Sequence, residues 1–271
     1  MVLLNPVWQG GGDLNTLEGA NELENLYLQQ VKYSETHVLR NNRSGKRVEN
    51  QIQGYTILRG QLHETLSLLR TEEPIRLFTI GGGCDADLAS ILYMNESCGE
   101  TLSLLWLDAH GDLNAPEESN TELFYGMVAR AALGGCPKMT DDIGARLLKP
   151  SQYTLIGGRD LDAPEKRFIS NNNIRILSEK CDAAELTDAL KNVKNLYIHL
   201  DLDVLDPKYC SYTPVPVENG MAPANLLKLL KELRSRCNVI GFGLFEYIPC
   251  GEKKNLMQEL INYGLSVAKD K

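Results

Sequence analysis

The order of short apolar runs and longer amphipathic stretches is the feature that most limits how this 271-residue chain can fold. Short runs rich in aliphatic residues alternate with stretches whose apolar residues recur at helical spacing. Strands that alternate with helices pair in parallel, and the helices cover both faces of the sheet. The predicted strands are 2–6, 36–40, 75–80, 102–107, 153–157, 174–178, 196–202 and 239–245, and the predicted helices are 18–31, 54–70, 86–95, 125–134, 183–192, 223–236 and 254–268.

Composition narrows the class of protein. The length suits one large α/β domain or two small ones, and without a convincing linker we expect a single domain over residues 1–271. The net charge of −8, with no long Lys/Arg cluster, does not indicate nucleic-acid binding. The seven cysteines have no paired spacing, which is typical of a reduced protein. The sequence also has no signal-peptide pattern and no apolar run near the ~18 residues of a membrane span. We therefore expect a cytoplasmic protein without a membrane partner. Self-association into a homo-oligomer stays open.

Two motifs place metal-ligand side chains directly at predicted strand ends. In LWLDAHGDLN, Asp108, His110 and Asp112 follow an apolar run. Side chains at alternate positions of an extended segment point to the same side, so the three are directed at one point. Asp201 and Asp203, in HLDLDVLDP, alternate in the same way. Because parallel α/β sheets bind ligands at the carboxyl ends of their strands, we expect both sets to meet there.

Carboxylates that converge this closely would raise one another's pKa, and divalent cations remove that repulsion. Oxygen ligands with some imidazole suit Mn²⁺. A carboxylate-bridged metal pair can hold a hydroxide at neutral pH and polarise an electrophile. Each motif alone has a plainer interpretation, since the first could cap a helix and the second could end in an Asp-Pro turn. Their joint presence at two strand ends favours a metal centre.

These segments also resemble a known family. DAHGD followed by Asn114, LDLDVLDP, a Gly-rich segment upstream and the late Glu246 with a nearby proline resemble the ureohydrolases, which are the arginases, agmatinases and formimidoylglutamases. The resemblance runs from about residue 75 to 250. It implies a three-layer α/β/α fold around an eight-stranded parallel sheet, with which the eight predicted strands agree. It also implies a hydrolase with a bridged dimanganese centre whose hydroxide attacks a guanidinium or amidine carbon.

The resemblance assigns the metal ligands one by one. Asp108 and Asp201 would bridge two Mn²⁺ ions, His110 and Asp203 would complete one site, and Asp112 would serve the other. The second site would also have a histidine from the Gly-rich segment. That segment here reads GGGCD and has a cysteine at the histidine position. The chain is therefore expected to hold one or two Mn²⁺ ions.

Cys84 is the cysteine at this position, and two interpretations of it stay open. It could be a small buried residue that binds nothing. It could instead be a thiolate ligand, which would favour Zn²⁺, Fe²⁺ or Co²⁺ over Mn²⁺. His199 lies two residues before Asp201 on the same face, where the family usually has serine. It could orient a carboxylate as a hydrogen-bond donor, or replace the missing ligand.

The resemblance further implies a substrate site. Asn114, Ser119 and Thr121 would hold the α-carboxylate of an amino-acid substrate, while RDLDAPE would hold its α-amino group through its second aspartate. Glu246 would pair with the guanidinium by charge-assisted hydrogen bonds. A plainer alternative is that the two aspartates of RDLDAPE, Asp160 and Asp162, cap the following helix. The expected substrate-binding residues are Asn114, Ser119, Thr121, Asp162, Glu165 and Glu246.

The expected catalytic residues are Asp112, Glu246 and Tyr125. Tyr125 stands where arginase-like members have a histidine proposed to carry protons, and a phenol with a pKa near ~10 is a poor proton carrier but a good hydrogen-bond donor. The matches predict an amidinohydrolase of arginine or of an N-substituted relative, such as N-hydroxy-arginine, in arginine metabolism. Two alternatives stay open: a catalytically weakened ureohydrolase-fold protein with a binding role, and another C–N hydrolase such as formimidoylglutamase.

Overall fold

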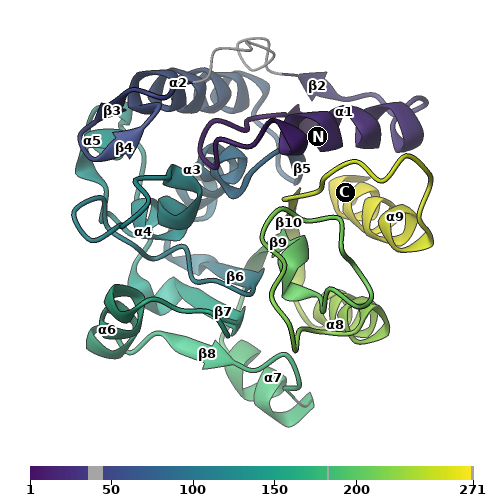
Figure 1. Cartoon of the computed structure of the whole chain (residues 1–271). Coiled ribbons are helices and arrows are strands. Elements are labelled where there is room, and N and C mark those ends of the chain that lie inside the picture. The colour runs from purple at the N-terminus through teal and green to yellow at the C-terminus, as the bar shows by residue number, and fades with distance from the viewer. Residues whose placement is uncertain (36–44, 182, 270–271) are drawn as a thin grey trace.

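A parallel sheet forms the centre of the computed structural model, which describes residues 1–35, 45–181 and 183–269. Figure 1 shows helices on both sides of this sheet. The strands of the sheet are β1 Val2–Asn5, β2 Ser34–Glu35, β5 Leu77–Gly81, β6 Leu102–Asp108, β7 Tyr153–Gly157, β8 Arg175–Leu177, β9 Asn195–Asp201 and β10 Asn238–Phe245. A separate two-stranded hairpin pairs β3 Val48–Glu49 with β4 Ile52–Gln53.

The strand order across the sheet is β2-β1-β5-β10-β9-β6-β7-β8, and every neighbouring pair is parallel. Eight strands are counted in the described residues, of which β2 has only two residues and each of the others has at least three. This confirms the predicted three-layer fold around a parallel sheet. The order places β5, β10, β9 and β6 side by side, so their carboxyl ends form one continuous edge.

Alternate side chains of the strands divide the core in two. On β6, Leu104 and Trp106 face the layer that contains α2, α3, α4 and α6, whereas Leu105 and Leu107 face the layer that contains α1, α7, α8 and α9. The period-two pattern of a strand buried on both faces produces this division. The helices are α1 Leu14–Tyr27, α2 Tyr55–Glu72, α3 Leu88–Cys98, α4 Val128–Ala132, α5 Pro137–Thr140, α6 Ala163–Asn171, α7 Ala183–Leu190, α8 Pro223–Arg236 and α9 Asn255–Lys269.

Several element boundaries differ from the predictions. The strand expected at 36–40 lies entirely outside the described residues, and the edge strand that is described is β2. The helix expected at 125–134 is shortened to α4, because a 3-10 turn occupies Phe124–Met127. Helix α6 was absent from the predicted set because it buries only Glu165 and Ile169, which leaves no apolar stripe to detect. Each helix of the described residues is too short or too polar to span a bilayer.

Candidate metal centre and adjoining cavity

The carboxyl-end edge of β5, β10, β9 and β6 brings together residues from four separate motifs. Asp108 is the last residue of β6, and Asp201 is the last residue of β9. Cys84 begins the short 3-10 turn that follows β5, and Glu246 comes directly after β10. Because these strands are consecutive in the sheet, side chains far apart in sequence converge at one place.

Asp108, His110 and Asp203 form the outer cluster, in which one ligand atom of each residue lies within 4.8 Å of the others. The Nδ1 atom of His110 lies 2.8 Å from an Asp203 oxygen and 3.4 Å from an Asp108 oxygen. The His110 side chain is 24% exposed, whereas both carboxylates are buried. Two oxygens and one nitrogen are a suitable donor set for a hard or borderline divalent cation.

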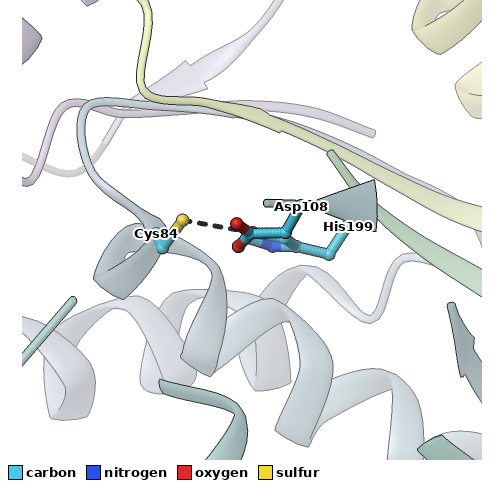
Figure 2. A group of neighbouring side chains, drawn as sticks. All are labelled: Cys84, Asp108 and His199. Atoms are coloured by element: carbon cyan, nitrogen blue, oxygen red, sulfur yellow. Dashed lines mark hydrogen bonds between the residues drawn. The ribbon is translucent and has the colours of Figure 1, made fainter. Parts of the chain in front are cut away.

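Cys84, Asp201 and Glu246 form the inner cluster, which meets the same 4.8 Å limit. The Cys84 thiol lies 3.3 Å from Oδ2 of Asp201, and the Cys84 backbone N–H donates to Oε1 of Glu246 over 2.9 Å. Each of the three residues is at most 4% exposed. Cys84 and Asp108 also group with His199 within 4.8 Å, and Figure 2 shows these three side chains facing one another. The inner cluster therefore offers sulfur and oxygen donors, and His199 adds a nitrogen donor next to it, all among buried residues.

Burial and like-charge crowding raise the pKa values of three carboxylates in these clusters. Burial, followed by the charge of Asp203, raises the pKa of Asp108 to about 7. Burial raises the pKa of Glu246 to about 8, although the Cys84 N–H opposes this shift. Burial and then the charges of Asp203 and Asp108 raise the pKa of Asp201 well above its ordinary value. A divalent cation would offset this like-charge crowding, so the donor set fits a metal.

Asp112 lies beside both clusters and has two unusual properties. Its backbone has φ +50°, and Glu246 has φ +58°, so both are non-glycine residues in the left-handed region. One Asp112 oxygen, Oδ2, is buried and has no hydrogen-bond partner among the described residues. Burial and the charge of Asp108 raise the pKa of Asp112 well above its ordinary value. Backbone strain and an unpaired buried oxygen at one residue are typical of a position that binds a ligand.

A cavity of about 310 Å³ adjoins the outer cluster. It contains every expected substrate-binding residue except Glu246, which belongs to the sealed inner cluster. The residues that line the cavity are His110, Asp112, Asn114, Ser119, Asn120, Thr121, Tyr125, Gly126, Asp160, Asp162 and Glu165.

One side of the cavity is built on the start of α6. Asp162 is the N-cap of this helix, so the plainer interpretation of that residue is confirmed. Its backbone N–H donates to Oε2 of Glu165 over 2.8 Å, and Leu113 N–H donates to Oε1 of Glu165 over 3.0 Å. Both Glu165 oxygens therefore hold the cavity lining in place. Asp160 is not the cap, and its carboxylate lies 3.8 Å from Nε2 of His110.

The polar groups of the cavity keep some of their hydrogen-bonding capacity. Asn114 donates through Nδ2 to Oδ2 of Asp162 over 3.0 Å, and its own Oδ1 has no partner among the described residues. The hydroxyl oxygens of Ser119 and Thr121 accept backbone N–H groups of the same loop. Burial and then the charge of Asp112 raise the pKa of Tyr125 to about 12, so its phenol keeps its proton at neutral pH.

The structure adds residues that the sequence analysis did not single out. Asp87 lies 2.8 Å from Nδ1 of His199, and the indole of Trp106 donates to Oδ2 of Asp108 over 2.8 Å. His199 therefore contacts Cys84 and, through its other ring nitrogen, the carboxylate of Asp87. The position of Trp106, two residues before Asp108 on one strand, was a usable signal. Asp87 gave none, because its partner is 112 residues away in the sequence.

Comparison with known proteins is consistent with this geometry. A sequence model described as Arginase family matches residues 19–262. An arginase of Staphylococcus aureus (strain MRSA252) is 32% identical over 164 residues, which cover 57% of this chain and 54% of that protein. An N(omega)-hydroxy-L-arginine amidinohydrolase of Streptomyces lavendulae is 30% identical over 170 residues, which cover 62% of this chain and 59% of that protein. The chain thus spans little more than half the length of the curated relatives it matches.

The fold is shared over a much longer span. The crystal structure of Entamoeba histolytica arginase in complex with L-ornithine superimposes with a TM-score of 0.84. The superposition covers 99% of this chain and 97% of that chain, at 19% sequence identity. At this identity the likeness establishes the common architecture.

Proposed function

The chain belongs to the arginase family, and from this membership we propose that it is a metal-dependent hydrolase of the guanidino group of arginine or of an N-substituted arginine. The observation that carries the proposal is the position of the outer cluster, whose imidazole opens into a cavity with substrate-sized volume and polar walls. An active site needs ligands for the ion and room for the substrate at the same place. The products would be urea, or a substituted urea, and an amino acid.

Asp108, His110 and Asp203 would hold a divalent cation next to the cavity, with Mn²⁺ suited to this oxygen-rich set. When bound, the cation would supply Lewis acidity and lower the pKa of water. Asp112 would stabilise the positive charge of the guanidinium group. It lines the cavity, and its buried Oδ2 has no hydrogen-bond partner among the described residues. Tyr125 would donate a hydrogen bond through its protonated phenol.

The charge of the cavity supports a cationic substrate. Four residues of the cavity lining are Asp or Glu, and the lining contains no Lys or Arg among the described residues. Formimidoylglutamate carries one more carboxylate than arginine, so this lining disfavours it. Asp162 would bind the α-amino group, and the Asn114 amide with the Ser119 hydroxyl would bind the α-carboxylate. Agmatine lacks that carboxylate and would leave these groups unpaired.

A substituted substrate is the second candidate. Tyr125 takes the position expected for a proton-carrying histidine, so a guanidine with a more reactive leaving group would suit the site better than arginine itself. The similarity to an N(omega)-hydroxy-L-arginine amidinohydrolase supports including this compound in the test. Arginine and N-hydroxy-arginine share the α-amino acid end, so both would use Asp162 in the same way.

The test changes the residue that would bind the α-amino group and compares two substrates, one with that amino group and one without it. Asp162→Asn keeps a good N-cap for α6 but removes the charge, so the fold should be preserved. We expect the KM for arginine to rise about 10- to 100-fold, because a charge-assisted hydrogen bond contributes roughly 1.5–3 kcal/mol. The KM for 5-guanidinopentanoate, which keeps the carboxylate and lacks the amino group, should hardly change.

Two results would contradict the proposal at different levels. An equal rise in KM for both substrates would show that Asp162 does not bind the amino group. A failure of the wild-type protein, loaded with Mn²⁺, Co²⁺ or Zn²⁺, to release urea or a substituted urea from any of these guanidines would reject the hydrolase itself.

A further inference from the structure

We infer that Cys84 and His199 form a sulfur–nitrogen ligand pair for a metal ion next to the inner cluster, and that this position takes Zn²⁺ in preference to Mn²⁺. Asp108 supplies the carboxylate beside them, since one ligand atom of each of the three residues lies within 4.8 Å of the others. The inference rests on the proposed function for its premise that the centre holds metal. It goes further by naming the imidazole that binds the inner ion and the chemical class of that ion, since thiolate ligands select softer cations.

The spacing of the donor atoms is that of ligands around one ion. With a Zn–S bond of about 2.3 Å and a Zn–N bond of about 2.0–2.1 Å, two tetrahedral ligands lie about 3.5 Å apart. Nε2 of His199 lies 3.3 Å from Sγ of Cys84, and Asp108 offers a ligand atom in the same group, in which the atoms lie within 4.8 Å of one another. Figure 2 shows the sulfur directed at the imidazole edge, with Asp108 next to it. A small expansion of this group would admit the ion.

The opposite side of the imidazole is held in the orientation that a ligand needs. Nδ1 of His199 lies 2.8 Å from Oδ2 of Asp87. Asp87 also accepts a hydrogen bond from the phenol of Tyr197 through Oδ1, and with the ionised carboxylate as acceptor at both oxygens we assign the ring hydrogen of His199 to Nδ1. The lone pair of Nε2 is then directed at Cys84. A carboxylate behind the imidazole is the usual arrangement of metal-binding histidines, because it determines the tautomer and raises the basicity of the ligand nitrogen.

Aromatic packing prevents the ring from turning away. The imidazole is stacked on Trp106, with 3.5 Å between ring centroids and 6° between planes, and on Phe245 at 4.9 Å and 13°. Gly243 pairs with His199 in the sheet register, and a Cβ at this glycine would lie 2.7 Å from an Asp87 oxygen and 2.4 Å from the Phe245 ring. Only glycine at this position lets both groups approach the imidazole.

The same three residues, Cys84, His199 and Asp87, could be interpreted as an activated cysteine nucleophile. Two observations favour a metal ligand. Cys84 is 1% exposed and does not line the cavity, so a substrate in the cavity does not reach its sulfur. The sulfur also faces the carboxylate of Asp201 at 3.3 Å, whereas a reactive thiolate needs electropositive surroundings. A cation between these groups removes the repulsion between thiolate and carboxylate.

The test uses Co²⁺ as a spectroscopic substitute for Zn²⁺ in the full-length protein. Metal-stripped wild-type protein titrated with Co²⁺ should develop the near-ultraviolet charge-transfer band of a thiolate–cobalt bond. Cys84→Ser should lose this band, while the control Cys136→Ser should keep it, because Cys136 is an equally buried cysteine that belongs to neither cluster. His199→Gln should weaken Zn²⁺ binding by at least about tenfold in competition with a chelator, while Mn²⁺ binding stays within about twofold.

The outcomes separate this inference from the proposed function. A wild-type protein that binds Co²⁺ without the band would overturn the inference, even if it hydrolyses guanidines, and this measurement needs no variant to fold. A band in a protein without hydrolytic activity would support the inference and reject the function. If iodoacetamide alkylates Cys84 at the same measurable rate in zinc-loaded and stripped protein, the thiol is not a ligand and the inference is wrong.

Discussion

The outer and inner clusters lie side by side at the ends of neighbouring strands, yet they differ in access and in donor atoms. The outer cluster has only oxygen and nitrogen donors, and its His110 opens into the cavity. The inner cluster includes the sulfur of Cys84 and is sealed from the cavity. A site open to the cavity can exchange ligands with a substrate, whereas a sealed one can act only through its charge. The comparison teaches that one strand-end edge can bring together two groups of donor atoms that differ in exposure and in chemical type.

Asp108 belongs to the outer cluster and also groups with Cys84 and His199, so its variant should give the largest effect and is the strongest test of the comparison. We expect Asp108→Asn to lower kcat/KM roughly 10²- to 10⁴-fold, because charge stabilisation by a metal contributes several kcal/mol. Metal per chain, measured by elemental analysis, should fall at the same time. Asp142→Asn is the control, since its carboxylate makes only an exposed ion pair with Arg59. If Asp108→Asn lowers kcat/KM by less than tenfold and keeps the metal content of the wild type, Asp108 does not bind the metal.

Removal of metal should give an intermediate effect that depends on pH. The pKa of Asp108 is raised from 3.8 to about 7 and that of Glu246 from 4.5 to about 8, so the folded protein binds more protons than the unfolded chain between about pH 4 and 8. Stability of the stripped protein should therefore fall as pH rises through this window. Bound metal replaces these protons, so the rise in Tm on adding metal should be larger at pH 8 than at pH 6.

Glu246→Gln sharpens this prediction because it removes one titrating group of the inner cluster. Thermal scans of the stripped variant should show a flatter fall of Tm with pH than the stripped wild type. A metal-induced rise in Tm that shrinks as pH increases would mean that the buried carboxylates are not the groups that the metal neutralises.

Tyr125 should give the smallest effect, because it lies on the cavity side and offers one neutral hydrogen bond. We expect Tyr125→Phe to lower kcat about 2- to 10-fold, which corresponds to the roughly 0.5–1.5 kcal/mol of such a bond. The pKa of this phenol is raised to about 12, so the pH–rate profile between pH 6 and 9 should keep its shape. A profile that loses its alkaline limb in the variant would instead make Tyr125 a proton carrier.

Most of the sheet could be predicted from the chain itself. The apolar runs were strong enough to place the central strands within about two residues, as for 102–107 against β6 and 196–202 against β9. Elements with few apolar residues were not predicted, because they show no clear periodic pattern. Helix α6 buries almost nothing, and the β3–β4 hairpin has two residues in each strand, too few to show alternation. Their formation depends on capping and on contacts with the rest of the fold.

The sequence by itself determined which side chains would meet around the outer cluster. Asp108 ends β6, Asp203 lies in the 3-10 turn Leu202–Val204 directly after β9, and parallel strands present their carboxyl ends at one edge. Only the tertiary structure decided the partners of Cys84. Its contact with His199 requires β10 to lie between β5 and β9, and sheet order is a long-range property that spacing along the chain does not encode. The carboxylate of Asp87 behind that imidazole depends on the same arrangement.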